Sequence, residues 1–327
     1  MTNSEPNIQR STGLNAFKRV MKWLMLAMLF LLTIFFILNF ALRITQVQNW
    51  VSKRVVKVIN EDINGNVSLG EIRIKFPSDI SLDDVLISSD GDTVIAASSI
   101  DINLLSGITS LIGGNANFDN IEITDAVVNV KRAEGAWVTN IDTIFQAIAS
   151  PNDTMTSNGV SGTKQPVEFS AKHVILNNVR YINDDKAYGN HHDIFVPYGE
   201  LSLESLDVLS NVLTLSRAYF KTPIAKMKTY PGVEPVYDGP EIHSDSIPPK
   251  LKIVAETMIV EDGIFEILNT KADKKELGPY QIDLNDMKLE EVQIEMADFS
   301  VRENDFYGSP SLISFKHPDG FILNGLA

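Results

Sequence analysis

The chain contains no cysteine, and it has few positive charges relative to negative ones. Its 327 residues include 28 Lys and Arg against 42 Asp and Glu. The absence of cysteine excludes disulfides, thiolate zinc sites and cysteine nucleophiles. Residues 1–43 hold five basic side chains and one acidic one, so the remaining 284 residues hold 23 basic and 41 acidic ones. A surface with that excess of negative charge repels phosphates, which argues against nucleic-acid binding.

The sequence also lacks the common catalytic and nucleotide-binding motifs. No GxSxG, HExxH, Walker A or GxGxxG pattern occurs. The best candidate for a metal site is His191, His192 and Asp193, with Asp184 and Asp185 nearby. Adjacent residues of an extended backbone point to opposite faces, so the two histidines are not expected to converge on one ion. We predict no catalytic residue, cofactor or metal site, and a hydrolase that uses His191 is the enzymatic alternative.

One long apolar run stands near the N-terminus. The segment from Trp23 to Leu42 has twenty residues without a charge, and as a helix it would span about 30 Å, the thickness of a bilayer core. A cleavable signal peptide is the alternative, but its apolar region is usually about 7–15 residues and ends in small residues. Asn39 and Ala41 match that cleavage pattern poorly. We predict a retained transmembrane helix over 23–42.

Basic residues before this run set its orientation. Lys18, Arg19 and Lys22 precede it, and positive charge is enriched on the cytoplasmic side of membrane spans. We therefore predict a cytoplasmic tail over 1–22 and export of the chain that follows the span. The protein would be a single-pass inner-membrane protein whose bulk is periplasmic.

Residues 43–64 are predicted to form an amphipathic helix directly after the span. Val51, Val55 and Val58 recur at helical spacing, with lysines on the other side. This helix either caps the domain that follows or lies at the lipid headgroups, with Trp50 as an interfacial anchor.

After Asn64 the apolar residues change from a helical period to alternation. Glu71–Phe76 and Ile121–Ile123 alternate apolar and polar residues, as strands with one buried face do. Helical patterns are few and short, at Leu104–Ile112 and Asn140–Ala149. We predict a mainly β fold, an elongated antiparallel β-sheet with few short helices.

Two polar breaks divide the strands. Residues 150–166 lack apolar periodicity and indicate a flexible loop, and the proline-rich segment Tyr230–Lys250 cannot continue a strand. The first break separates a β segment over 65–149 from a second one over 167–327.

A loose unit recurs four times within the strands. An alternating run reaches an acidic or amide residue, then a small or branched one, and then alternates again. The four turn residues are Asp125, Asn178, Asp262 and Glu291. Such residues suit a tight reversal or a β-bulge. The repetition predicts a sheet that grows by adding strands.

The apolar face of such a sheet has two possible uses. It is either an ordinary core or, if no second layer covers it, a trough open to acyl chains. The candidate lining residues are Ile72, Ile74, Phe76, Ile121, Ile123, Val174, Leu176, Ile253, Ile264 and Ile267.

Four stretches resemble AsmA-like proteins, and among these the N-terminal region of TamB-type translocation and assembly proteins. The stretches are RITQVQNWVSKRVVKVINEDINGNVSLGEIRIKF from Arg43, SDISLDDVLISSDGDTVIAASSIDINLLSG from Ser78, FDNIEITDAVVNVKRAEGAWVTNIDTIFQAI from Phe118 and LISFKHPDGFILNGLA from Leu312. The resemblance implies an inner-membrane anchor, a taco-shaped β-groove in the periplasm and phospholipid passage toward the outer membrane. For TamB-type members it also implies an Omp85-class barrel as partner in outer-membrane protein assembly.

This chain differs in length from the members of that family. About fifteen strands at about 4.8 Å each would make a groove of roughly 70 Å, and family members are usually several times longer. We expect the chain to be the membrane-proximal part of a longer protein, without the region that meets the barrel. The alternative function is a membrane-tethered periplasmic interaction scaffold that conducts no lipid.

Overall fold

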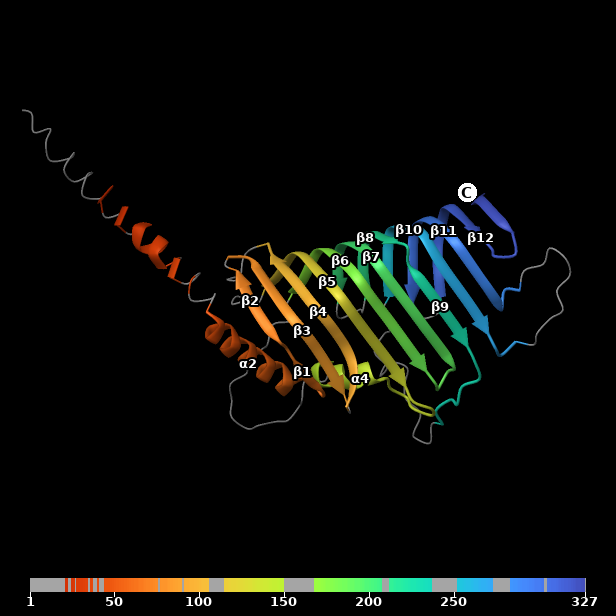
Figure 1. Cartoon of the computed structure of the whole chain (residues 1–327), viewed down its shortest axis with the longest axis horizontal. Coiled ribbons are helices and arrows are strands. Elements are labelled where there is room, and N and C mark those ends of the chain that lie inside the picture. The colour runs from red at the N-terminus through yellow and green to blue at the C-terminus, as the bar shows by residue number, and fades with distance from the viewer. Residues whose placement is uncertain are drawn as a thin grey trace, which may run out of the picture.

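The strands of this protein lie side by side in one long curved sheet (Figure 1). The structure is a computed structural model. It describes residues 44–327 apart from 76, 90, 106–114, 150–167, 208–211, 237–251, 273–282, 303–304 and 327, and before them 21–22, 25–26, 28–34, 36–37 and 40. The mainly β class with few short helices is confirmed.

The bounds of the described elements are as follows. The helices with assigned bounds are α2 (Thr45–Asp62) and α4 (Asn140–Ala149). The first seven strands are β1 (Asn66–Ser68), β2 (Glu71–Lys75), β3 (Asp79–Ser89), β4 (Asp92–Leu104), β5 (Asn115–Arg132), β6 (Glu168–Asp185) and β7 (Asn190–Asp207). The remaining strands are β8 (Val212–Lys221), β9 (Ile224–Thr229), β10 (Lys252–Asn269), β11 (Asp286–Arg302), β12 (Asp305–Lys316) and β13 (Ile322–Leu326).

The order of the strands follows the chain almost throughout. It runs β1-β3-β4-β5-β6-β7-β8-β10-β11-β12-β13, with β2 also paired to β3 and β9 paired to β7 and β10. Because β1 and β2 share one neighbour, and β8 and β9 share two, the described sheet has eleven rows of strands. At a spacing of about 4.8 Å it is roughly 48 Å long, shorter than the length expected from the sequence.

The prediction that the sheet is antiparallel is wrong at three pairings. β5 pairs with β6 in parallel, and β10 pairs in parallel with both β8 and β9. Parallel neighbours need a long connection between them. The two polar breaks found in the sequence lie within those connections, so they mark crossovers within one continuous sheet.

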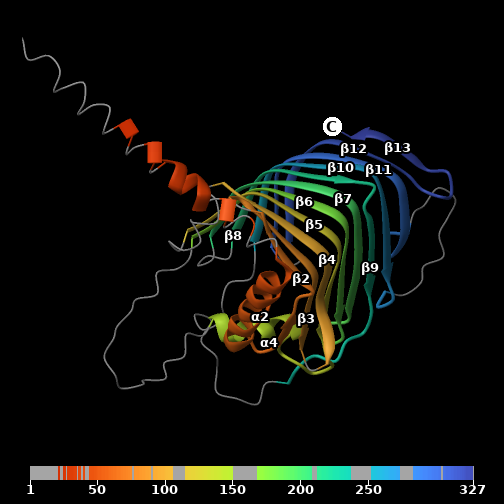
Figure 2. The same ribbon diagram turned by 60° about the vertical axis from the view of Figure 1, so that its left-hand side comes forward.

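The sheet is strongly curled, with one concave and one convex face (Figure 2). A row of residues with left-handed backbone crosses it near the middle of the strands. We call Asp84, Asp125, Asn178, Thr222, Asp262 and Glu291 the bend row; their φ angles lie between 49° and 54°. From Asp84 to Asp262 they stand level with one another in the strand registers, with Ser98 and Pro197 filling the row on β4 and β7.

The bend-row residues shift the alternation by one position, within a strand or, at Thr222, between β8 and β9. On β5, Ile123 and Ala126 both pack in the apolar cluster around Val85, so Thr124 and Asp125 face the other way in succession. A residue in this conformation bends a strand as a bulge does, and Asp and Asn tolerate it better than most residues. The apolar side chains therefore stay on one face along both arms of a bent strand.

The recurring unit of the sequence is this bend. Asp125, Asn178, Asp262 and Glu291 all have positive φ, and each lies inside one long strand. Of the two expectations for this unit, the tight reversal is wrong. The bulge is confirmed at Asp262 and Glu291, where the register between β10 and β11 shifts, whereas the registers continue unshifted past Asp125 and Asn178. In the recurring unit, a small or branched residue follows the bend-row residue, and after Asp262 this residue is Gly263. A Cβ added to Gly263 would lie 3.0 Å from side-chain atoms of both Val260 and Phe265, which explains the small residue at this position.

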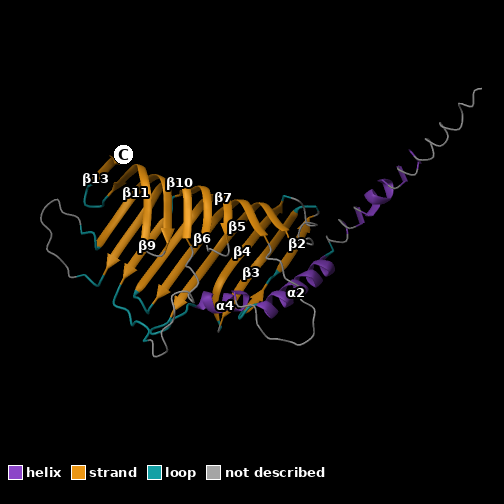
Figure 3. Ribbon diagram, turned by 180° about the vertical axis from the view of Figure 1, so that it is seen from behind, coloured by secondary structure: helices purple, strands orange, loops and turns teal. Residues whose placement is uncertain are grey.

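The helices lie at the β1–β5 end of the sheet (Figures 2 and 3). Helix α2 lies against β1 and β2, and α4 against β3 and β5. An asparagine from each helix bonds to strand backbone. Asn60 Nδ2 donates to Val67 O (3.1 Å), and Asn60 Oδ1 accepts from Val67 N (2.6 Å). Asn140 Nδ2 donates to Asn129 O (2.9 Å), and Asn140 Oδ1 accepts from Lys131 N (2.8 Å).

The sequence predictions for the helices have mixed outcomes. The helices expected over 43–64 and Asn140–Ala149 are confirmed. Residues 106–112 of the third expected helix lie outside the described residues, and Leu104 belongs to β4. Within the part of the chain that is described, no helix combines the length and apolarity needed to cross a bilayer. The described residues cover the segment 23–42 only in pieces, so the transmembrane helix stays a prediction.

Candidate functional site

The concave side of the sheet carries the apolar side chains, and we call it the inner face. Three apolar clusters follow one another along it. They centre on Val85, Ala97 and Ala126, on Leu104, Phe118 and Ala171, and on Leu215, Ala218 and Ala255. Leu203 packs against the last two clusters, so the apolar surface is continuous between them.

The inner face is hollowed between β7 and β12. A space of about 700 Å³ is lined almost entirely by apolar side chains from six neighbouring strands. Its walls include Ile194, Leu215, Phe220, Ile253, Met258, Val260, Phe265, Met296 and Phe299. Its size is within the range of about 300–1,000 Å³ usual for ligand sites. We call this space the hollow.

Most of the sequence-predicted lining residues are on the inner face. Ile253 lines the hollow, and Ile121, Val174 and Ile123 pack against the first two clusters. Leu176 Cδ1 lies 3.3 Å from where a Cβ on Gly199 would be, next to Phe220 of the hollow.

The remaining predicted lining residues are placed by register. Ile72 and Ile74 stand opposite Leu82 and Ile80, which pack in the clusters. Ile267 lies two residues after Phe265 on β10, so its side chain points to the same face as Phe265, which lines the hollow. Phe76 lies outside the described residues.

The prediction for Ile264 is wrong. Ile264 alternates with Phe265, which lines the hollow, and its register partner Ile224 lines a depression on the convex side with Arg180 and Asp193. The cause is Asp262, since its left-handed backbone shifts the alternation and turns Gly263 and Phe265 inward. The prediction had placed Ile264 and Ile267 on one face, although residues three apart in a straight strand point to opposite faces.

The convex side, or outer face, is polar. Arg180 donates to Asp193 through Nε at 2.7 Å and Nη2 at 2.6 Å. This bidentate pair lowers the pKa of Asp193 and raises that of Arg180. Further outer-face contacts include Arg73–Asp83 at 2.8 Å, Lys226–Glu266 at 3.1 Å, Tyr219 Oη to Glu261 at 2.6 Å and Asn178 Nδ2 to Asp125 at 3.0 Å. The two faces of the sheet thus differ sharply in polarity.

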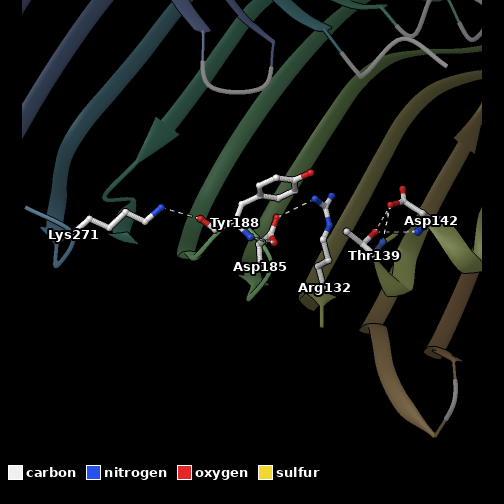
Figure 4. A network of polar contacts seen from close by, with 6 residues as sticks. All are labelled: Arg132, Thr139, Asp142, Asp185, Tyr188 and Lys271. Carbon is white, nitrogen blue, oxygen red and sulfur yellow. Dashed lines mark hydrogen bonds and ion pairs between the residues drawn. The ribbon is translucent and has the colours of Figure 1, made fainter. Parts of the chain in front are cut away.

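A polar network closes the ends of β5, β6 and β10 at one rim of the inner face (Figure 4). Arg132 Nη1 lies 3.4 Å from Asp185 Oδ2, and its guanidinium lies over the Tyr188 ring at 5.0 Å. Tyr188 N donates to Asp185 (3.0 Å), and Lys271 Nζ donates to Tyr188 O (3.1 Å). The Arg132–Asp185 ion pair and the bond from Lys271 to the Tyr188 carbonyl thus connect the ends of these strands.

The histidine cluster of the sequence does not converge. His192 has the parity of Ile194 and faces inward, whereas His191 lies on the other face with its Nδ1 3.5 Å from Asp184. Asp193 is taken by Arg180. Burial lowers the pKa of His192, the charge of His191 lowers it further, and Asp185 opposes the shift. Among the described residues, no group of three His, Asp or Glu is placed to hold a metal ion.

The predicted anchor residues are only partly visible. Trp23 and Leu42 lie outside the described residues. Trp50 on α2 is 68% exposed. The large apolar side chains described between Met25 and Phe40 are also exposed, from 37% at Ile34 to 75% at Met25. The described large apolar side chains between Met25 and Phe40 therefore remain largely exposed.

Sequence reasoning missed most of the hollow. Leu213, Leu215, Ala218 and Phe220 on β8 line it, as do Met296 and Phe299 on β11. The signal was present, because Leu213-Thr-Leu215 alternates and Ala218-Tyr-Phe220 resumes one position later. That second phase shift was not recognised.

Comparisons of the chain with models of protein families, with curated proteins and with solved structures gave no match.

Proposed function

We propose that this protein is a membrane-anchored, non-enzymatic β-groove that holds phospholipid acyl chains and lets lipid pass along its inner face. The observation that carries the proposal is the hollow. It is apolar on all its strands, and helices α2 and α4 lie against β1, β2, β3 and β5 at the other end of the sheet. An apolar surface of this size needs an apolar occupant, since monomeric proteins seldom leave one in water.

The energetics favour hydrocarbon as that occupant. Each CH₂ group transferred from water to apolar surroundings contributes about 0.8 kcal/mol. Tyr307 is the one lining residue with a side-chain hydroxyl, and the other lining side chains are apolar, while the ion pairs Arg73–Asp83 and Lys226–Glu266 lie on the outer face. Acyl chains would contact the inner face without specific polar interactions. Such binding suits the passage of lipid better than its tight retention.

The source of the lipid follows from the N-terminal segment. Apolar side chains that are exposed over Met25–Phe40 are stable in a bilayer. We propose that residues 23–42 anchor the chain in the inner membrane, that 1–22 are cytoplasmic, and that the sheet stands in the periplasm. Trp50, exposed on the helix that links span and sheet, fits the headgroup region.

The wider role rests on the resemblance to AsmA-like and TamB-type proteins. We propose membership in that family and, through it, a part in cell-envelope biogenesis: phospholipid transport toward the outer membrane, outer-membrane protein assembly, or both. An Omp85-class barrel as partner belongs to the same proposal.

The second candidate is a tethered interaction scaffold. It is favoured by exposed aromatic and apolar side chains at the β12–β13 end of the sheet, where Phe306, Tyr307, Phe321 and Ile322 are 46–66% exposed. A scaffold would bind protein there and leave the hollow without lipid.

Two neighbouring substitutions separate these functions. Ile253 lines the hollow, and Val254 points to the outer face. We expect the full chain, extracted in mild detergent, to carry phospholipid that a lipid mass spectrum detects. Ile253→Asp should lower that lipid at least about fivefold, because a carboxylate in the hollow is costly to desolvate, whereas Val254→Asp should not. Wild-type protein without phospholipid would favour the scaffold.

A further inference from the structure

The methionines of the sheet gather in one part of the inner face. Four methionines are described after α2, and they lie on β9, β10 and β11. Met258 and Met296 line the hollow. Met227 has the parity of Ala225, which lines the hollow, and Met287 stands in register with Ile267 of the inner face. All four side chains thus face the groove.

The other end of the inner face has a different lining. On β2–β6 it combines many β-branched side chains with leucines, alanines and Phe118, and it contains no methionine among the described residues. The β-branched side chains include Ile72, Ile74, Ile80, Ile100, Ile102, Ile121, Ile123 and Val174. β-Branched side chains are restricted at χ1, while methionine has three rotatable side-chain bonds and a polarizable sulfur that fill irregular space. One groove therefore has a stiff end and an adaptable end.

Met258 and Met296 border the hollow and have small residues as neighbours. Met296 Sδ lies 2.3 Å and Cγ 2.8 Å from where a Cβ on Gly308 would be, so the glycine leaves the space that Met296 fills. Met258 packs next to Ala218 and Ala255, two of the smallest side chains of the lining. Small neighbours let a long side chain change rotamer without moving the backbone.

We propose that Met227, Met258, Met287 and Met296 make the β9–β11 part of the groove tolerant of acyl chains that differ in length and in cis-unsaturation. The inference rests on the proposed function and takes a membrane phospholipid as occupant, for which the exposed apolar run at the N-terminus is the supporting observation. A cis double bond kinks a chain, and a lining that repacks around the kink removes the preference for straight chains. The protein would then bind saturated and unsaturated phospholipids in the proportions in which its membrane contains them.

The test compares two sets of four substitutions of similar volume on the same face. One variant carries Met→Leu at the four methionines. The control carries Ile→Leu at Ile100, Ile102, Ile121 and Ile123, which pack at the stiff end. Full chains are extracted from membranes that contain saturated and cis-unsaturated phospholipid, and the ratio of the two in the bound lipid is divided by their ratio in the membrane.

We expect a quotient near one for wild type and control, and a loss of unsaturated chains of about threefold or more for the Met→Leu variant. Bound lipid with an unchanged quotient in that variant would overturn the inference and leave the proposed function intact. Wild type without lipid would overturn both. Thermal unfolding identifies a variant that fails to fold, and the single changes Met258→Leu and Met296→Leu then give the decisive quotients.

Discussion

At the scale of single residues, the bend row determines which side chains point to the inner face of the sheet. Asp125 and Asp262 hold φ angles of 49° and 53° in the middle of long strands. Their side chains project from the outer face, where Asp125 accepts a hydrogen bond from Asn178. The residue type is thus dictated by backbone conformation and solvent exposure.

Asp125→Val should destabilise the sheet. A β-branched residue in left-handed backbone costs about 1–2 kcal/mol, and the bond from Asn178 is lost as well. Asp125→Asn should stay close to wild type, because asparagine tolerates this backbone and keeps an acceptor oxygen. Chemical unfolding of the detergent-extracted chain measures both. Equal stability of the valine and asparagine variants would contradict the role assigned to the bend row.

His192 should make stability depend on pH between about 7.5 and 5.5. Burial lowers its pKa in the folded protein below the ordinary value of 6.5, so the unfolded chain binds the proton more readily. The contribution of neutral His192 is complete above pH 6.5 and is lost as the pH falls through 6.5 toward the folded pKa.

The measurement is the thermal midpoint at pH 7.5 and at pH 5.5. The midpoint of the wild type should fall further between these two values than that of His192→Asn. A fall of the same size in both proteins would show that His192 contributes nothing to the pH dependence. The difference between the two falls is the contribution of His192.

Residue-level prediction from sequence succeeded where the determinant is local. Acidic and amide residues recurring within alternating runs identified four positions of the bend row. The face of Ile264 was misassigned because Ile264 was grouped with Ile267, three residues further on, whereas the strand alternates without a bend between them. Whether a turn residue reverses a strand or bends it depends on which strand pairs beside it, and that information is not local.

At the scale of elements, both helices are tied to strand backbone by one asparagine each. Asn140 begins α4 and bonds to Asn129 and Lys131 on β5, beyond the point where β4 pairing stops at Val128. Over that stretch, the side-chain amide of Asn140 makes the backbone hydrogen bonds that a neighbouring strand would otherwise make. Asn60 of α2 does the same at Val67 of β1.

Asn140→Ala should loosen the end of β5 without unfolding the sheet. Two hydrogen bonds of about 0.5–1.5 kcal/mol each are lost, so amide exchange at Lys131 should accelerate by about tenfold or more. Asn60→Ala is the matched control: it should accelerate exchange at Val67 and leave Lys131 unchanged. Unchanged exchange at Lys131 in Asn140→Ala would rule out this role of the amide.

The helices could be predicted from sequence, and the parallel pairings could not. The helical spacing of Val51, Val55 and Val58 is a local signal, and it predicts α2. The pairing of β5 with β6 joins strands separated by a connection of more than thirty residues. No local pattern encodes which side of a strand such a connection returns to.

At the scale of the whole molecule, one sheet separates an apolar inner face from a charged outer face. The curl brings six strands around the hollow, and the outer face is covered with ion pairs such as Arg180–Asp193. Alternating strands predicted the two faces. The hollow itself was not predictable, because its depth depends on the curvature that the bend row imposes on all strands together.

The most direct measurement of the central claim uses photocrosslinking amino acids at adjacent positions on opposite faces. Phe265 and Leu176 face inward, and Ile264 and Asn177 outward. In living cells we predict phospholipid adducts at Phe265 and Leu176 and none at Ile264 and Asn177. Lipid adducts of equal yield on both faces, or only protein adducts at the inward positions, would contradict the account.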